Sequence, residues 1–296
     1  MKTYVLYHAQ CNDGFGAAFA AWLALGHEAE YRAVQYGQPA PKMESGSKVM
    51  ILDFSYNRNT LEELRRQHNS ILVLDHHQTA KEQLEGLPYC RFEADKSGAV
   101  MAWEHFFPNE PVPVFMQYLQ DRHLWRWALN GSREINAAIA SYPHEFEVWE
   151  RISGLWRKQR FGTVQTEALC ELEKQGEVCL RLVAQYVDRV LSKHHCARLD
   201  TRYRLATPEP RERIQERDLP PEVHYVPAAN SGLLQSEVCE TLLKQYEQAP
   251  FAACYCRVED GSTVWSLRSR ADFDCSAVAK VFGGGGHRQA AGFTTR

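Results

Sequence analysis

Three short apolar segments near the start of the chain each lead into acidic residues or histidines. The segments are Thr3–Tyr7, Lys48–Phe54 and Ser70–Asp75, and the residues that end or follow them are His8, Asp13, Asp53, Asp75, His76 and His77. Continuous apolar runs of this length are typical of strands in a parallel sheet that is covered on both faces. Because ligands bind beyond the carboxyl ends of such strands, the sequence predicts that these six side chains converge at one sheet edge.

Segments with helical character separate and follow these strands, which indicates an α/β fold. Helices are expected over Gly14–Leu25, Asn59–Gln67 and Ser97–Phe107, and their alternation with strands favours a largely parallel sheet. Apolar residues at helical spacing predict a long connecting helix over Thr163–His194. The segment Arg198–Pro221 is rich in proline and charged residues, so it is expected to be a loop near a domain boundary.

The C-terminal part of the chain predicts a second, smaller α/β unit. Strands are expected over Val223–Ala229, Phe251–Val258 and Ser262–Ser269, and helices over Ser236–Gln248 and Asp274–Phe282. A chain of 296 residues is long enough for two domains. The predicted fold class is therefore α/β, with a mostly parallel N-terminal domain (1–160), a helical connector (161–196) and a smaller C-terminal α/β domain (197–296).

Composition and charge restrict the class of protein. The net charge is only −3, so a nucleic acid would have to be bound by a local basic patch, which favours a short substrate. The nine cysteines include no CxxC pair, which argues against a structural zinc site or a disulfide framework and fits a reducing compartment. No segment approaches the roughly 20 apolar residues of a membrane span. A cytoplasmic protein without membrane association is expected, and its oligomeric state is left open, a homodimer included.

The six converging side chains form a suitable donor set for divalent metal ions. Carboxylates and imidazoles together suit Mn²⁺ or Mg²⁺ better than they suit soft metals, and two ions about 3.5–4 Å apart can activate water for attack on a phosphate. Asp121 is a further candidate, because it lies on an apolar helical stripe where a carboxylate needs a charge partner. Each residue taken alone has an ordinary structural interpretation, such as ending a strand or capping a turn. Their coincidence at three strand ends favours a metal site.

The order of these motifs resembles the DHH superfamily of phosphoesterases. Four motifs of the N-terminal part match in the family's order: His8-x-x-Cys11-x-Asp13-Gly14, Leu52-Asp53, Asp75-His76-His77 and Gln120-Asp121-Arg122. The segment Gly283–Phe293 (GGGGHRQAAGF) resembles the glycine-rich motif of the DHH-associated domain. The chain is therefore similar, over nearly its whole length, to the oligoribonuclease and pAp phosphatase members of this family.

The resemblance implies a centre of two Mn²⁺ ions with Asp53 as the bridging ligand. His8 and Cys11 would complete one site, and the other would be completed by Asp13, His76 and Asp121. Asp75 would orient His76, and His77 would face the substrate phosphate.

One position departs from the family's pattern, because Cys11 stands where an aspartate is usual. A thiolate is a softer ligand than a carboxylate. Cys11 would therefore ligate a metal, weaken the first site or shift its metal preference. The alternative is a small buried thiol that contacts no metal.

Candidate substrate-binding residues lie near the C-terminus. Glycines at this point allow backbone amides to approach an anion closely, and two arginines on the preceding strand lie two residues apart, hence on one face. The candidates are Gly284, Gly285, Gly286, His287, Arg288, Arg268 and Arg270. The alternative is a flexible glycine loop beside solvated arginines.

These observations predict hydrolysis of a phosphate ester, with His77 and Asp75 as catalytic residues and two metal ions activating water. The expected substrates are short oligonucleotides, linear dinucleotides or 3′-phosphorylated nucleotides. One alternative is an inorganic pyrophosphate or polyphosphate hydrolase. Another is a non-catalytic nucleotide-binding sensor with an altered metal site, which only Cys11 favours.

Overall fold

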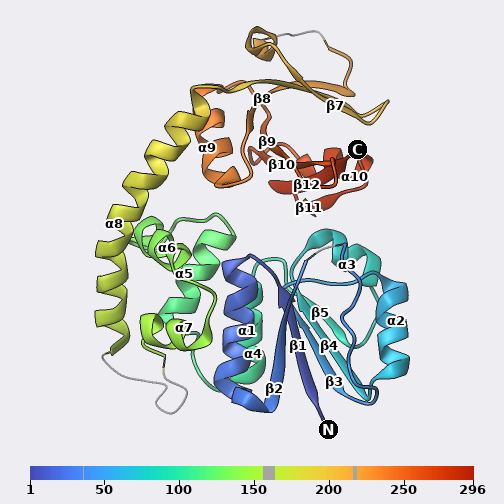
Figure 1. Cartoon of the computed structure of the whole chain (residues 1–296), viewed down its shortest axis with the longest axis vertical. Helices are drawn as coiled ribbons and strands as arrows, with labels where there is room; N and C mark the ends of the chain where they lie inside the picture. The colour runs from blue at the N-terminus through green and yellow to red at the C-terminus, as the bar shows by residue number, and fades with distance from the viewer. Residues whose placement is uncertain (36, 156–163, 216–218) are drawn as a thin grey trace. The chain divides into compact units, whose positions relative to one another are not determined.

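The computed structural model describes residues 1–35, 37–155, 164–215 and 219–296, shown in Figure 1. They divide into two compact units, Met1–Leu180 and Arg181–Arg296, and the division falls within the long helix α8 (Val164–Leu191). The predicted α/β fold class is confirmed. Residues 161–163, where the predicted connector begins, lie outside the described residues. In the part of the chain that is described, no helix is both long and apolar enough to cross a membrane.

The N-terminal unit is built on a parallel sheet of five strands in the order β2-β1-β3-β4-β5. Their bounds are β1 (Thr3–His8), β2 (Ala29–Val34), β3 (Lys48–Leu52), β4 (Ser70–Asp75) and β5 (Cys90–Phe92). The three strands predicted from the sequence are the central ones, so their carboxyl ends are immediate neighbours. This topology places the acidic residues and histidines that follow them at one edge.

Side chains alternate between two cores, one on each face of this sheet. In β3, Val49 and Ile51 pack toward α2 (Arg58–Gln67) and α3 (Gln78–Leu84), whereas Met50 and Leu52 pack toward the helices on the other face. Those helices are α1 (Asn12–Leu25), α4 (Gly98–Phe106), α5 (Val114–His123), α6 (Ser132–Ser141) and α7 (Phe146–Ser153). Burial on both faces explains why the central strands are continuously apolar, and Figure 1 shows α1 and α4 opposite α2.

A buried glycine sets the distance between α8 and α6. A Cβ atom at Gly176 would lie 1.8 Å from the backbone oxygen of Glu134, and a backbone atom cannot move aside as a flexible side chain can. Gly176→Ala is therefore expected to destabilise the N-terminal unit by about 1–3 kcal/mol, although alanine favours helices by up to about 1 kcal/mol over glycine. Urea denaturation measures the change. The exposed neighbour Glu177 provides the control, because Glu177→Ala should change stability by less than about 0.5 kcal/mol. Equal losses of stability in the two variants would contradict the close approach of α8 to α6 at Gly176.

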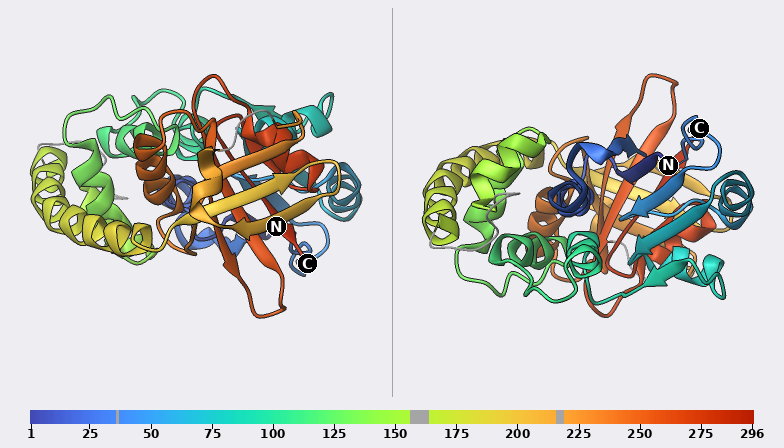
Figure 2. Two further views of the ribbon diagram at one scale, coloured as in Figure 1. Left: turned by 90° about the horizontal axis from the view of Figure 1, so that it is seen from above. Right: turned by 90° about the horizontal axis from the view of Figure 1, so that it is seen from below.

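The C-terminal unit contains a mixed sheet of seven strands in the order β11-β12-β10-β9-β8-β6-β7. Their bounds are β6 (His195–Asp200), β7 (Leu205–Glu209), β8 (Val223–Asn230), β9 (Phe251–Arg257), β10 (Thr263–Ser269), β11 (Gly285–His287) and β12 (Ala290–Thr295). One face packs against α10 (Cys275–Val281) and the other against α9 (Gln235–Gln245) and the end of α8. Figure 2 shows the β9–β10 hairpin as the orange-red loop that projects from this sheet.

The predicted loop over Arg198–Pro221 is wrong for most of its length. Its first half belongs to β6 and β7, which form an antiparallel pair, and a short 3-10 helix follows over Arg211–Gln215. Pro208 is compatible with this arrangement because β7 is the last strand of the sheet, and an edge strand can lack an N–H donor on its open side. The proline signal therefore marked an edge strand, not a boundary loop.

Candidate metal centre

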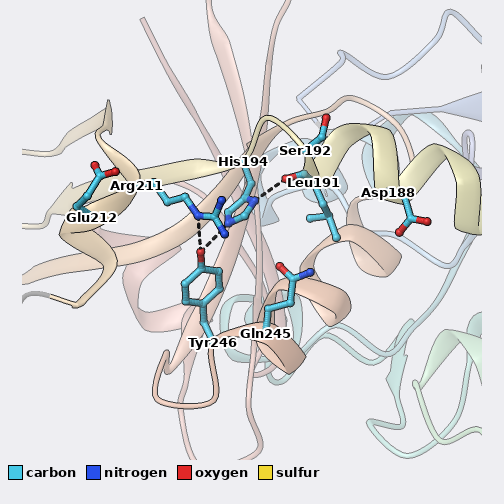
Figure 3. Close-up of a pocket in the computed structure, with 8 residues that line it drawn as sticks. All are labelled: Asp188, Leu191, Ser192, His194, Arg211, Glu212, Gln245 and Tyr246. Carbon is cyan, nitrogen blue, oxygen red and sulfur yellow. Dashed lines mark hydrogen bonds between the residues drawn. The ribbon is translucent and has the colours of Figure 1, made fainter.

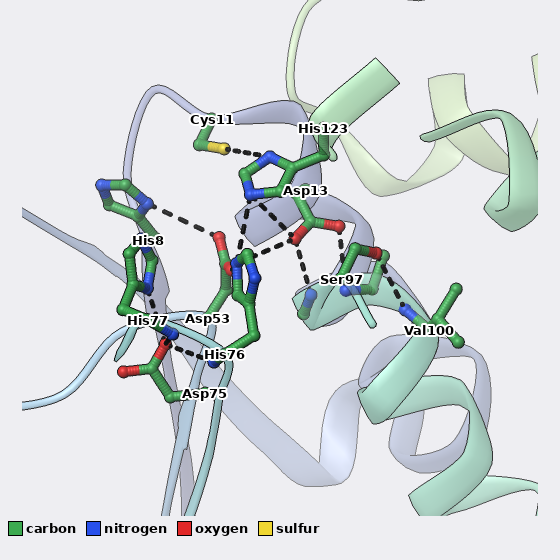
Figure 4. Close-up of polar contacts among 12 residues, drawn as sticks. His8, Cys11, Asp13, Asp53, Asp75, His76, His77, Ser97, Val100 and His123 are labelled. Carbon is green, nitrogen blue, oxygen red and sulfur yellow. Dashed lines mark hydrogen bonds and ion pairs between the residues drawn. The ribbon is translucent and has the colours of Figure 1, made fainter. Parts of the chain in front are cut away.

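The carboxyl ends of β1, β3 and β4 bring the predicted side chains together. His8 ends β1, Asp53 follows β3 directly, and Asp75 ends β4 before His76 and His77. Cys11 and Asp13 enter from the start of α1, and His123 enters from the last residue of α5. Figure 4 shows these side chains pointing toward one another.

Asp53 lies at the middle of this cluster and is fully buried. Its Oδ1 atom is 3.1 Å from His76 Nε2 and its Oδ2 atom is 3.5 Å from His8 Nδ1, yet neither oxygen accepts a hydrogen bond of normal geometry from the described residues. Its backbone is held at a positive φ of 63° by a hydrogen bond from its N–H to Leu74 O. A buried carboxylate without donors is costly unless a positive charge faces it, so the geometry around Asp53 calls for cations.

Asp53 belongs to two groups of metal-ligating atoms. One contains Asp13, Asp53, His76 and His123, the other His8, Cys11 and Asp53, and within each group the ligand atoms lie within 4.8 Å of one another. In the first group, His123 Nε2 is 3.1 Å from His76 Nε2 and 3.7 Å from Asp13 Oδ2. The mixed oxygen and nitrogen donors of these groups fit divalent metal ions.

Backbone amides fix Asp13 from the opposite side. Its Oδ2 accepts a hydrogen bond from Gly98 N at 2.6 Å and its Oδ1 one from Ala99 N at 3.0 Å, both in the first turn of α4. Ser97 caps the same helix by accepting a hydrogen bond from Val100 N. The start of α4 therefore holds Asp13 in place and leaves Oδ2 turned also toward the two histidines.

Burial and neighbouring charges shift the pKa values of these groups. Burial lowers the pKa of His76, but the opposite effect of Asp53 brings it above its ordinary value, to about 9. Burial and Asp53 act in the same two directions on His8, whose pKa is raised to about 10. Burial and the neighbouring Asp53 raise the pKa of Asp13 to about 7. Burial raises the pKa of the Cys11 thiol, whereas His123 and His8 lower it, to about 7. Without other cations, protonated imidazoles would have to neutralise Asp53.

Asp75 is also fully buried, but its oxygens have hydrogen-bond donors. Oδ1 accepts from the N–H groups of His76 and His77 at 2.7 and 3.2 Å and lies 2.7 Å from His77 Nδ1. Ser55 Oγ donates to Oδ2 at 2.6 Å. Burial raises the pKa of Asp75, yet His77 and Ser55 lower it to a value below the ordinary one. Asp75 thus orients the imidazole of His77, whereas the resemblance implied that it orients His76.

Asp121 does not join either group. Its carboxylate accepts hydrogen bonds from Ala128 N at 3.0 Å and Leu129 N at 3.3 Å, which ties down the segment after α5. His123, which was not predicted, contributes to the centre instead. Residues two apart on a helix project in different directions, so only one of this pair can face the site. The only sequence signal for His123 was a histidine at the end of the predicted helix. Whether His123 or Asp121 points toward the centre depends on how the helix is rotated about its axis.

The C-terminal candidates have structural partners within their own unit. Arg270 donates to the carbonyl oxygens of Leu243, Tyr246 and Ala249 at the end of α9 and just beyond it. Arg268 donates to Ser236 Oγ at 3.0 Å and to Leu267 O at 2.8 Å. Arg288 accepts a hydrogen bond from Cys275 N through its carbonyl oxygen. Arg268 lies on β10, whereas Arg270 follows the last residue of that strand, so the prediction that both lie on the strand is wrong for Arg270. Substrate binding by Arg268, Arg270 and Arg288 stays a prediction, although hydrogen bonds to carbonyl oxygens at the end of α9 already engage the Arg270 guanidinium.

The glycine run likewise has a structural explanation. Gly283 N and Gly284 N donate to carbonyls of α10, and β11, which begins at Gly285, pairs with β12. A Cβ at Gly284 would lie 2.0 Å from Gly292 O, so the close approach of two backbones requires glycine. Binding of an anion by Gly284, Gly285, Gly286 and His287 remains a prediction.

A separate pocket of about 670 Å³ lies in the C-terminal unit, and none of the predicted site residues is among its lining residues (Figure 3). His194 Nε2 is 2.6 Å from the Tyr246 hydroxyl, which also accepts a hydrogen bond from Arg211 Nε at 2.9 Å, and His194 Nδ1 faces Leu191 O. Both nitrogens of this buried histidine are thus engaged. The network ties the ends of α8 and α9 to the segment after β7, which is a structural role.

No protein-family model matches the chain. An uncharacterized protein of Acanthamoeba polyphaga mimivirus is 27% identical over 311 residues, which cover 97% of this chain and 66% of that protein. The chain therefore spans just under two thirds of the length of that relative.

Several solved structures are similar at low identity. They include an uncharacterized protein from Helicobacter pylori (16% identical, TM-score 0.41, covering 100% of this chain and 93% of that chain). A pGpG-specific phosphodiesterase from Vibrio cholerae is 13% identical with a TM-score of 0.42, covering 99% and 93% of the two chains. An exopolyphosphatase-related protein from Bacteroides fragilis is 13% identical with a TM-score of 0.44, covering 98% and 86%. Identities of 13–16% and TM-scores below 0.5 carry no conclusion about function, which therefore has to be inferred from the residues of the site.

Proposed function

We propose that this protein is a metal-dependent phosphoesterase that hydrolyses phosphate esters of nucleotides or short oligonucleotides. The observation that carries the proposal is Asp53, a fully buried carboxylate without normal hydrogen-bond donors among the described residues, shared by two groups of metal-ligating side chains. The resemblance of the motifs around Asp13, Asp53 and Asp75 to the DHH phosphoesterases supports the same conclusion. Mn²⁺ is the proposed metal, with Mg²⁺ as the alternative of similar ligand preference.

The centre has separate residues for holding metal and for holding substrate. Two divalent ions bound here would activate water and neutralise charge on phosphate oxygens. Asp53 would contact both ions, His8 and Cys11 would hold one, and Asp13, His76 and His123 the other. Because the start of α4 already anchors Asp13, its carboxylate does not have to be reorganised when a metal binds.

His77 is the proposed contact to the substrate phosphate. Its Nδ1 atom faces the Asp75 carboxylate, so Nδ1–H would donate there and Nε2 would contact the phosphate. The side chain is 14% exposed, unlike the fully buried His76 side chain, so it can be reached from outside the cluster. Ser55 supports this arrangement through its hydrogen bond to the other oxygen of Asp75. Asp75 and Ser55 would therefore act as positioning residues for His77.

A nucleotide substrate is proposed in preference to pyrophosphate or polyphosphate. The support for this choice is the resemblance of Gly283–Phe293 to the glycine-rich motif of the DHH-associated domain, together with the basic side chains Arg268 and Arg288 in the same unit. The small net charge favours short substrates, because only a local basic patch could hold a nucleic acid.

A product-resolved assay tests the proposed function. The full chain is incubated with Mn²⁺ and, in turn, a chromogenic phosphodiester, adenosine 3′,5′-bisphosphate, di- to pentanucleotides, cyclic dinucleotides and pyrophosphate. Turnover of the chromogenic ester and of linear nucleotides is expected, and a chelator should abolish it. His77→Ala should lower kcat by at least about 100-fold, within the range for loss of a residue that stabilises charge or transfers a proton, with bound metal unchanged. No turnover of any substrate, or turnover of pyrophosphate alone, would contradict the proposal.

A further inference from the structure

The two groups of ligands that share Asp53 differ in chemistry. The group with Asp13, His76 and His123 supplies only carboxylates and imidazoles, whereas the group with His8 supplies the sulfur of Cys11. Sulfur ligands select softer metals, and carboxylates select hard ions such as Mn²⁺ and Mg²⁺. Two sites that are joined by one carboxylate would therefore not have the same metal preference.

The position of Cys11 shows that its side chain is directed at the centre. Cys11 is the N-cap residue of α1, where serine, threonine, aspartate or asparagine normally accepts a hydrogen bond from the first turn. Its side chain makes no such cap. The thiol instead turns toward His123, with 4.0 Å between Sγ and Nδ1, and lies in the group with His8 and Asp53. Figure 4 shows the sulfur atom on the inner side of the loop between β1 and α1.

The imidazole of His123 touches both groups through its two nitrogens. Nε2 faces His76 Nε2 at 3.1 Å and Asp13 Oδ2 at 3.7 Å, and Nδ1 faces Cys11 Sγ. Two ring nitrogens at 3.1 Å, with carboxylate oxygens around them, are the arrangement expected of ligands that point at one cation. The second nitrogen of a metal-bound histidine commonly donates to a negatively charged partner, and a Cys11 thiolate would be that partner.

We infer that the protein has two unlike metal sites, in which Cys11 is a sulfur ligand beside His8 and Asp53 and makes that site selective for Zn²⁺, Co²⁺ or Fe²⁺ over Mn²⁺. His123 ligates the other ion through Nε2, in the place that the resemblance had implied for Asp121. This inference rests on the metal centre of the proposed function but not on the hydrolysis itself.

Titration of the metal-free full chain with Co²⁺ tests the inference without measuring activity. A sulfur-to-cobalt charge-transfer band in the near ultraviolet is expected in the natural protein and in the control Cys170→Ser, which changes an exposed cysteine. The band should be absent in Cys11→Ser and Cys11→Asp, and the affinity for Zn²⁺ should fall more than about 10-fold, the smallest loss typical even of a ligand-orienting residue. Cys11→Asp should retain binding of two Mn²⁺ ions.

Alkylation of the natural protein provides a measurement that does not depend on the folding of a variant. Zn²⁺ is expected to protect Cys11, but not Cys170, from iodoacetamide, as peptide mapping would show. Cobalt binding without the band, a band that persists in Cys11→Ser, or equal alkylation of Cys11 with and without Zn²⁺ would overturn the inference. If the charge-transfer band appears but no substrate is hydrolysed, the proposed function is wrong and the two unlike metal sites stand. If the protein hydrolyses substrates with Mn²⁺ but shows no band, the proposed function stands and the inference about Cys11 is wrong.

Discussion

Asp53→Asn is expected to abolish hydrolysis and to prevent the binding of a metal pair. Asp53 is the one residue common to both ligand groups, and an asparagine of nearly the same shape removes its negative charge without opening a cavity. Loss of a residue that only orients a ligand lowers metal affinity by about 10–100-fold, so loss of the shared ligand should lower activity by more than about 100-fold.

Thermal unfolding gives a second readout for this variant. A ligand that binds only the folded chain adds about 2.7 kcal/mol of stability when its free concentration is 100 times its Kd, so Mn²⁺ should raise the melting temperature of the natural protein. Asp53→Asn should lose this increase. Glu62→Gln, which changes an exposed carboxylate on α2, should retain both activity and the metal-dependent increase. Full activity in Asp53→Asn would contradict the assignment of Asp53.

Gly98→Ala is expected to disable the centre although it removes no ligand. A Cβ atom at this position would lie 2.5 Å from both the Cβ and the Oδ1 atoms of Asp53, and the N–H of Gly98 also anchors Asp13. The methyl group must therefore displace Asp53, Asp13 or the start of α4. Overpacking of this kind costs about 1–3 kcal/mol of folding free energy. A displacement of about 1 Å at a catalytic site costs up to about 100-fold in rate.

Gly232→Ala is the matched control for this substitution. A Cβ at Gly232 would meet only the side chain of Cys256, at 3.4 Å, so activity should be unchanged and stability should change by less than about 0.5 kcal/mol. Urea denaturation and steady-state kinetics on the two glycine variants separate the local effect on the centre from a general effect of adding a methyl group. If Gly98→Ala were as active and as stable as Gly232→Ala, the tight packing of α4 against Asp53 would be refuted.

Much of the N-terminal fold could be predicted because its central strands carry a strong signal. The apolar runs around Val5, Ile51 and Val73 are buried on both faces and bounded by polar residues. The edge strands β2 and β5 were not identified, because they are only partly buried and their patterns lack a continuous apolar run. In the C-terminal unit, β11 and β12 consist largely of glycine, alanine and threonine, residues that a sequence pattern assigns to turns as readily as to strands.

The gathering of side chains at the centre was predictable for the same reason, whereas their individual contacts were not. Neighbouring parallel strands force His8, Asp53 and Asp75 to one edge whatever the details of packing. The choice of His123 over Asp121 depends on the rotation of α5, and the contact of Asp75 with His77 depends on the backbone just after β4. Neither is encoded in residue spacing, because both arise from how the helix and the loop pack against the sheet.

Anomalous diffraction from crystals grown with Mn²⁺ tests the central claim most directly. The account predicts two manganese peaks on either side of the Asp53 carboxylate, one near Asp13, His76 and His123 and the other near His8 and Cys11, the second being replaced first when Zn²⁺ is added. Crystals of the folded protein with no manganese at Asp53, or with histidines and carboxylates turned away from a common point, would contradict it.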